Sequence, residues 1–258
     1  MLSMPTPRSI PRRTLSAPAT SGVRLAKRVA EMRGCSRAQA EQIIEGGCVR
    51  VDGVVVEEPQ FRVAEQTVTI DADASPLDLA PVTLLLHKPP GVHSDTAHKL
   101  LNPAAHAADD TAPTRVLKRH FAKLVPGAPL EPAASGLMVF TQDWRVARKL
   151  EEDASTLEHE LLVEVAGAVS PEALNQLHYG FGPDRQSLPP HKASIGSASE
   201  TSTKLRFAIK GSHPGLLAYL CERAGLRILG LKRLRMGRVS MAQLPVGQWR
   251  YLQGYERF

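Results

Sequence analysis

Residues 24–56 read RLAKRVAEMRGCSRAQAEQIIEGGCVRVDGVVV, and this stretch decides the fold of the N-terminal part of the chain. Leu25, Val29 and Met32 recur at helical spacing, which predicts a short amphipathic helix with basic residues beside its apolar stripe. Ser36 and a glutamine three positions later match a capping box, which predicts the start of a second helix.

A hairpin should follow the second helix. Two β-branched runs, residues 49–51 and 54–56, flank the dipeptide Asp52-Gly53, a pair typical of tight hairpin turns. The predicted order is therefore helix, helix, hairpin.

The chain of 258 residues is long enough for one small and one larger domain. A stretch over 71–81, rich in Asp, Ala and Pro, predicts a linker between a first domain over 23–72 and a second over 82–258. Residues 1–22, rich in proline and carrying three arginines, are expected to form a disordered basic tail.

Charge and composition limit the partners, cofactors and cellular locations that we expect for the chain. Lys and Arg number 32 against 26 Asp and Glu, a net charge of +6 that suits an acidic partner such as RNA without requiring one. The three cysteines show no disulfide or zinc spacing, and we expect neither a metal nor a cofactor. The chain has no apolar run of about 18 residues, so we expect no membrane contact and a cytoplasmic location. Nothing in the sequence implies an oligomer.

The second domain should be mixed α/β, which makes the whole chain α+β. Strand-like runs occur near residues 82–86, 137–141, 161–165 and 205–209. Helices are expected over 144–152, from Ser170 and Pro171 onward, and over 215–223. Residues 102–113 should form a surface loop.

Residues 24–63 resemble the alpha-L RNA-binding module of ribosomal protein S-four. The resemblance lies in SRAQA at the head of the second helix (36–40) and in VRVDG in the hairpin (49–53). It implies that cations and helix starts of this module meet RNA phosphates, the alternative being an ordinary solvated face. The RNA-binding residues that it implies are Arg24, Lys27, Arg28, Ser36, Arg37 and Arg50.

Three further stretches resemble the small-ribosomal-subunit type of pseudouridine synthase. They are LLLHKPPGV (84–92), LGLKRLRMG (229–237) and LPVGQWRYL (244–252), in the family's own order. The family isomerises uridine to pseudouridine in RNA, breaking the glycosidic bond and rejoining the base through carbon. The resemblance implies RNA contacts, to rRNA above all, from Lys88, Lys232, Arg233 and Arg235.

The family's catalytic aspartate lies in a Gly-Arg-Leu-Asp motif, and Ala128-Pro129-Leu130-Glu131 aligns with it. Glu131 therefore takes the catalytic position, and Pro129 replaces the arginine. A glutamate carboxylate reaches farther than an aspartate carboxylate, and a misplacement of about 1 Å can cost about a hundredfold in rate.

Two more positions depart from the family's pattern. Leu161 takes the place of a tyrosine, and the helix before Cys221 lacks the family's arginine and glutamine. Two readings follow: an RNA isomerase that uses Glu131, or a non-catalytic RNA-binding homologue acting in ribosome assembly or RNA surveillance. A protein-interaction scaffold is a third reading, with no feature in its favour.

Overall fold

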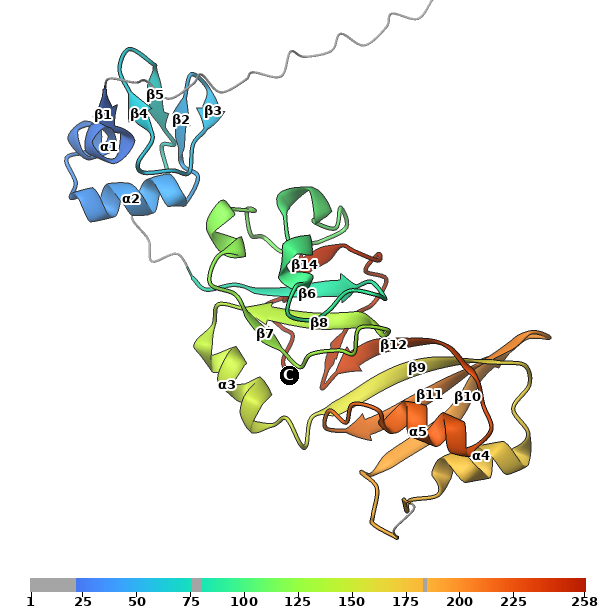
Figure 1. Ribbon diagram of the computed structural model, residues 1–258. Coiled ribbons are helices and arrows are strands. Elements are labelled where there is room, and N and C mark those ends of the chain that lie inside the picture. The colour runs from blue at the N-terminus through green and yellow to red at the C-terminus, as the bar shows by residue number, and fades with distance from the viewer. Residues whose placement is uncertain (1–21, 76–79, 183–184) are drawn as a thin grey trace, which may run out of the picture. The chain divides into compact units, whose positions relative to one another are not determined.

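The computed structural model describes residues 22–75, 80–182 and 185–258, which separate into two compact units (Figure 1). The first unit runs to Ala80 and includes Leu117–Arg119, and the second holds Pro81–Val116 and His120–Phe258. Residues 1–21 of the tail expected over 1–22 lie outside the described residues. Residues 76–79 of the expected linker do so as well.

The first unit has the predicted order of helix, helix and hairpin. Its capping box is present: the Gln39 N–H donates to Ser36 Oγ, and the Ser36 N–H donates to Gln39 Oε1. Its helices are α1 (Leu25–Arg33) and α2 (Arg37–Glu45), and its strands are β1 (Val23–Arg24), β2 (Val49–Val51), β3 (Val54–Val55), β4 (Arg62–Val63) and β5 (Val68–Ile70).

The hairpin joins β2 to β3 through Asp52 and Gly53. Both have positive φ, 50° and 81°, as a tight primed turn requires, and Val51 pairs with Val54 across it. Strand β5 pairs with the other side of β2, and β1 pairs with β4.

The core of the first unit corrects one expectation. Leu25 and Val29 are fully buried, but Met32, in the last turn of α1, is 50% exposed. Ala26 and Ala30 complete the buried side of the helix instead.

The second unit is built on one mixed sheet in the order β10-β11-β9-β12-β8-β6-β14, with β13 beside β12 and β7 beside β8. The pairing of β8 with β12 is parallel, and the others are antiparallel. The strands are β6 (Thr83–Lys88), β7 (Val125–Gly127), β8 (Ser135–Thr141), β9 (Glu158–Ala166), β10 (His191–Ala198), β11 (Ser202–Lys210), β12 (Ile228–Met236), β13 (Val239–Ser240) and β14 (Trp249–Tyr251).

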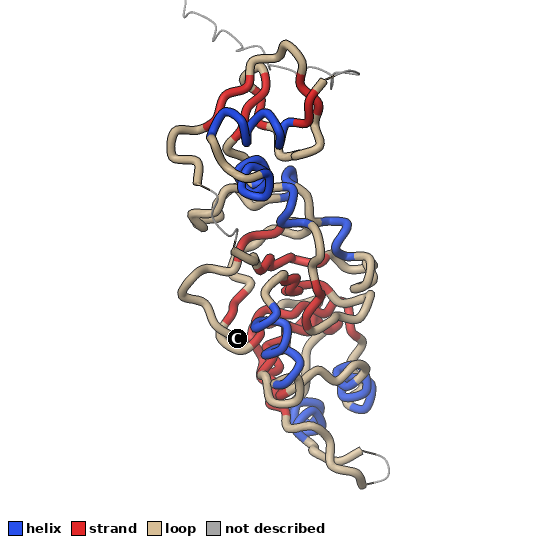
Figure 2. The backbone as a smooth tube through the Cα atoms, turned by 90° about the vertical axis from the view of Figure 1, so that its left-hand side faces the viewer, coloured by secondary structure: helices blue, strands red, loops and turns tan. Residues whose placement is uncertain are grey.

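Helices flank this sheet, and Figure 2 shows the red strands of the second unit stacked together with the blue helices outside them. Helices α4 (Pro171–His178) and α5 (Leu216–Arg223) belong to the core that lies over β9 and β11. Helix α3 (Trp144–Glu152) lies beside β7 and β8. Short 3-10 helices cover Ala97–Leu100, Pro103–Ala105 and Lys118–Phe121.

The predicted helices of this unit form within one residue of their expected starts, and the predicted strands all form with longer bounds. Asp143 caps α3 and Ser170 caps α4, since each side chain accepts a hydrogen bond from a backbone N–H of the first turn. The 3-10 turn Pro103–Ala105 lies where a loop was expected. None of the described helices is long and apolar enough to cross a bilayer.

Candidate functional site

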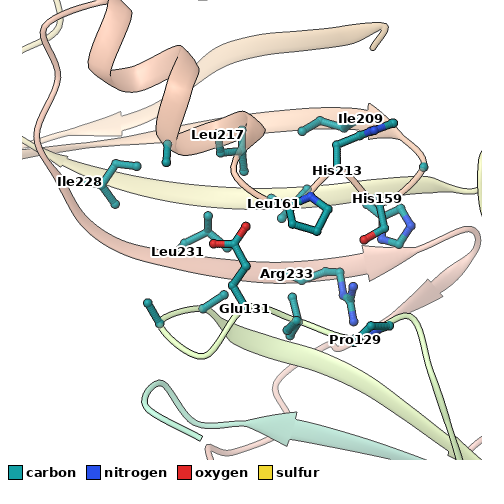
Figure 3. Close-up of a pocket in the computed structure, with 17 residues that line it drawn as sticks. Pro129, Glu131, His159, Leu161, Ile209, His213, Leu217, Ile228, Leu231 and Arg233 are labelled. Carbon is teal, nitrogen blue, oxygen red and sulfur yellow. The ribbon is translucent and has the colours of Figure 1, made fainter. Parts of the chain in front are cut away.

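A cavity of about 200 Å³ lies where the segment before β8 meets β9, β12 and the start of α5 (Figure 3). Its wall is largely apolar, with a carboxylate, a guanidinium and two imidazoles among the aliphatic side chains. The lining residues that matter below are Pro129, Glu131, His159, Leu161, His213, Leu217, Leu231 and Arg233.

Glu131 reaches into this cavity from the segment before β8. In Figure 3 its carboxylate points toward Leu161 and Leu231. Its Oε1 accepts a hydrogen bond of 2.6 Å from the Gly215 N–H, at the N-cap of α5. Gly215 has no side chain with which to cap the helix, so the Glu131 carboxylate does so from another part of the chain.

Arg233 supplies a fixed cation in the cavity wall. Its side chain is 2% exposed, its Nε donates to the Leu137 carbonyl oxygen at 2.8 Å, and its Nη2 donates to that of Ala128 at 2.6 Å. Burial lowers the pKa of Arg233 to about 9, so the group stays charged at neutral pH. Within the described part of the chain, no ion pair joins Arg233 to Glu131.

His159 is the residue of this cavity that sequence reasoning missed. It is 3% exposed, and burial, followed by the charges of Arg233 and His213, lowers its pKa to about 4. The ring is therefore neutral at physiological pH. The signal was present, since His159 lies two residues before Leu161 on β9 and alternate strand residues share a face.

A second cavity, of about 400 Å³, adjoins the first between α3 and strands β7 and β8. The two cavities share Pro129, His159 and Ser212. His159 therefore lies in the wall between two hollow regions.

Leu161, at the position of the family's tyrosine, lines the first cavity without closing it. On α5 the lining residues are Leu217 and Ala218, while Leu216 belongs to the core. Leu161 and the side chains of α5 therefore leave the cavity open. Tyr219 packs against the same core.

Lys88 corrects the expectation that it binds RNA. Its side chain is fully buried, and its ammonium group donates to the carbonyl oxygens of Pro89 at 3.0 Å, Val92 at 2.7 Å and Pro132 at 3.2 Å. An ammonium group has three N–H donors, so none is left for a phosphate. Burial, with a smaller contribution from the Arg233 charge, lowers the pKa of Lys88.

The structure does not bring Lys232, Arg233 and Arg235 together. Arg233 faces the cavity, and Lys232, its neighbour on the strand, faces the opposite side of the sheet. Arg235 forms ion pairs with Glu158 at 2.6 Å and Glu160 at 3.1 Å. Of the three side chains, only that of Lys232 makes no hydrogen bond or ion pair with an acid or carbonyl among the described residues, and it is partly exposed.

In the first unit, three of the expected RNA-binding cations share a groove. Arg24, Lys27 and Arg37 line a groove of about 290 Å³ together with Pro59, Gln60, Ala26 and Glu41. All three cations are exposed.

The other expected residues of this unit make internal contacts. Ser36 caps α2, and Arg50 is paired with Asp71. Arg28 lies 3.5 Å from the Ala64 carbonyl oxygen.

Comparison with known proteins gives one match within the first unit and several along most of the chain. The S4 domain family matches residues 23–68. A chloroplastic protein of Arabidopsis thaliana, SVR1, whose name places it among ribosomal large subunit pseudouridine synthases, is 28% identical over 233 residues. That match covers 83% of this chain and 54% of the Arabidopsis protein, so the chain spans about half the length of that relative.

Two further similarities cover nearly the whole chain. Ribosomal large subunit pseudouridine synthase B of Bacillus subtilis is 27% identical over 241 residues, which cover 90% of this chain and 93% of that protein. A crystal structure of a pseudouridylate synthase aligns with a TM-score of 0.54 at 19% identity, covering 90% of this chain and 96% of the other, which shows a common fold.

Proposed function

The chain is an S4-domain relative of the RNA pseudouridine synthases of the small-subunit type, and from this premise we propose that it binds structured RNA, with ribosomal RNA as its partner. The observation that carries the proposal is the groove of Arg24, Lys27 and Arg37, three exposed cations on one small module. Such a cluster suits the phosphates of a folded RNA.

We assign this role to an RNA-binding module over 23–72, preceded by a basic tail over 1–22, and a synthase-like domain over 82–258. A cytoplasmic location fits an RNA partner of this kind. Lys232, the partly exposed cation of the motif on β12 that is not bonded to an acid or carbonyl among the described residues, would add a phosphate contact from the second domain.

The cavity beside Glu131 suits a single extruded base. Enzymes that act on a base take it out of its stack into a closed site, and apolar walls with a few polar groups are the usual lining of such sites. We assign the uridine to this cavity, with its ring against Leu161 and Leu217. Arg233 provides a charge in the wall that would stabilise negative charge on a detached uracil.

The reaction would be the isomerisation of uridine to pseudouridine, with Glu131 as its carboxylate. The bond between N1 of the base and C1′ of the ribose breaks, a bond from C5 to C1′ forms, and the proton lost from C5 is balanced by the proton that N1 gains. Atoms and electrons balance within the nucleoside, so the step requires no cofactor.

One observation favours a second candidate, RNA binding without catalysis. The Glu131 carboxylate caps α5 through Gly215, and no described cation pairs with it. A carboxylate held in this way is positioned for a structural task, and Leu161 offers no hydroxyl and no aromatic face to the base.

Pseudouridine mapping separates the two candidates. Purified protein is incubated with unmodified ribosomal RNA transcripts, and wild type is compared with Glu131→Ala. Catalysis predicts a modified uridine that Glu131→Ala forms at least about a hundredfold more slowly. RNA binding by both proteins with no pseudouridine from either identifies the non-catalytic function. If neither protein binds ribosomal RNA, both candidates are wrong.

A further inference from the structure

Four side chains near the C-terminal ends of α4 and α5 form one contiguous cluster, named here the aromatic–arginine cluster: Tyr179, Phe181, Tyr219 and Arg223. The ring centroids of Tyr179 and Phe181 are 5.8 Å apart with the planes tilted by 59°. The Arg223 guanidinium carbon lies 5.4 Å from the ring centroid of Tyr179 and 5.4 Å from that of Tyr219. A cation therefore lies between two tyrosine rings.

Arg223, the last residue of α5, fixes the segment that carries two of these rings. Its guanidinium donates to the carbonyl oxygens of Gln176 at 2.5 Å, Tyr179 at 2.8 Å and Phe181 at 2.9 Å. Three bonds from one planar group hold the chain beyond α4 in a set geometry. The rings are therefore positioned before any ligand arrives.

The outer rings of the cluster remain open to solvent. Tyr179 is 56% exposed and Phe181 is 48% exposed. A single exposed apolar side chain is ordinary, but two adjacent rings joined to an arginine form a platform. Such platforms are what single-stranded nucleic acid binds, because each base has a flat face that stacks on an aromatic ring or a guanidinium plane.

The cluster is connected to the Glu131 cavity. Tyr219 lines a shallow depression of about 380 Å³, and this depression shares His213 and Pro214 with the cavity. An RNA strand whose uridine enters the cavity would therefore carry a neighbouring nucleotide across His213 toward Tyr219 and Arg223.

We propose that the aromatic–arginine cluster is a stacking site for an unpaired nucleobase that flanks the uridine held in the cavity. The inference rests on the proposed RNA-binding function and extends it, because it gives the synthase-like domain a base contact outside the cavity. Stacking accepts any base, so the site contributes affinity and strand position without reading sequence.

Binding of a short single-stranded oligouridylate tests the site. The double variant Tyr179→Ala with Phe181→Ala is compared with wild type, and Trp144→Ala is the matched control, since Trp144 is a 67% exposed aromatic on α3. Loss of a stacking ring should weaken binding roughly 5- to 150-fold, whereas the control should bind as wild type does. Tyr179→Phe keeps the ring and should retain wild-type affinity.

An oligomer of the same length without bases identifies the contact. Wild type and the double variant should bind this abasic oligomer equally, because nothing remains to stack. Equal binding of oligouridylate by wild type and the double variant overturns the inference, as does weaker binding of both oligomers by the variant. If wild type binds neither oligouridylate nor ribosomal RNA, the proposed function itself has failed.

Discussion

At the scale of the residue, Lys88 and Lys232 both lie in stretches that resemble RNA-binding motifs. They have different roles because one side chain is buried and the other is partly exposed. The Lys88 ammonium group is buried and donates to three carbonyl oxygens. Lys232 is partly exposed. The first therefore stabilises a turn, and the second remains available to a phosphate.

Substitution of each lysine by methionine should separate these tasks. Lys88→Met leaves buried carbonyl oxygens without donors and should lower the free energy of unfolding by about 2–4 kcal/mol, with little effect on RNA affinity while the protein is folded. Lys232→Met should weaken RNA binding and leave stability within about 0.5 kcal/mol. Urea unfolding and RNA titration measure both quantities, and weaker RNA binding by a folded Lys88→Met would contradict the assignment.

The buried imidazole of His159 should make the free energy of unfolding depend on pH. Its pKa is about 4 when folded against 6.5 for an unperturbed histidine, so the unfolded chain takes up a proton first as pH falls. The stability that the neutral ring contributes is complete above pH 6.5 and is lost as pH falls toward 4, a change of about 3 kcal/mol.

Urea unfolding as a function of pH measures this dependence. The free energy of unfolding of His159→Gln should vary less with pH over this window than that of wild type. The exposed His178, replaced in the same way, serves as the control and should keep the wild-type profile. A wild-type profile in His159→Gln would show that the imidazole does not titrate in this window.

The sequence allowed the position of Glu131 to be predicted but not its contact. Alignment with a motif gave its place before β8, whereas its partner Gly215 is 84 residues away. The sequence also did not allow us to predict that the Arg233 side chain faces the cavity. Register shifts in β12 on either side of Arg233 change which residues share a face.

At the scale of the elements, the parallel contact between β8 and β12 joins the two halves of the sheet. Gly136 pairs with Arg233 at this contact. A Cβ atom on Gly136 would lie 2.3 Å from the Arg233 carbonyl oxygen and 2.5 Å from its backbone nitrogen, and the residue has a φ of 111°. The close approach of the two strands therefore requires glycine.

Gly136→Ala should lower the free energy of unfolding by about 2 kcal/mol or more, since both the contact and the backbone angle oppose a side chain. Gly230 on β12 is the matched control: a Cβ there meets no atom within 4 Å, and Gly230→Ala should change stability by less than about 0.5 kcal/mol. Urea unfolding compares the two, and equal stability would show that the strands can separate at this point without cost.

Elements with local signals were predictable, and elements that depend on pairing were not. Capping residues placed α2 and α4 within a residue of their starts. Strand β10 escaped prediction because HKASIGSA has no apolar alternation and lies at the sheet edge, where its pairing with β11 alone defines it. Strand β14, with the fully buried Trp249, is defined by its pairing with β6.

At the scale of the whole molecule, net charge predicts RNA binding less well than whether each cation is already paired with an acid. Helix α3 carries three exposed cations, and all of them are paired with acids: Arg145 with Asp143, Arg148 with Glu152 and Lys149 with Asp153. The groove on the first unit also offers three exposed cations, of which Lys27 is 3.9 Å from Glu31. Both sets contribute equally to the net charge of +6, yet only the groove is expected to hold phosphates.

The salt dependence of ribosomal RNA binding tests this claim most directly. Two triple alanine variants that lose the same charge are compared, one at Arg24, Lys27 and Arg37 and the other at Arg145, Arg148 and Lys149. The groove variant should lower the slope of log affinity against log salt concentration by roughly 3, one unit for each lost phosphate contact, and the α3 variant should keep the wild-type slope. Equal slopes for the two variants would contradict the account.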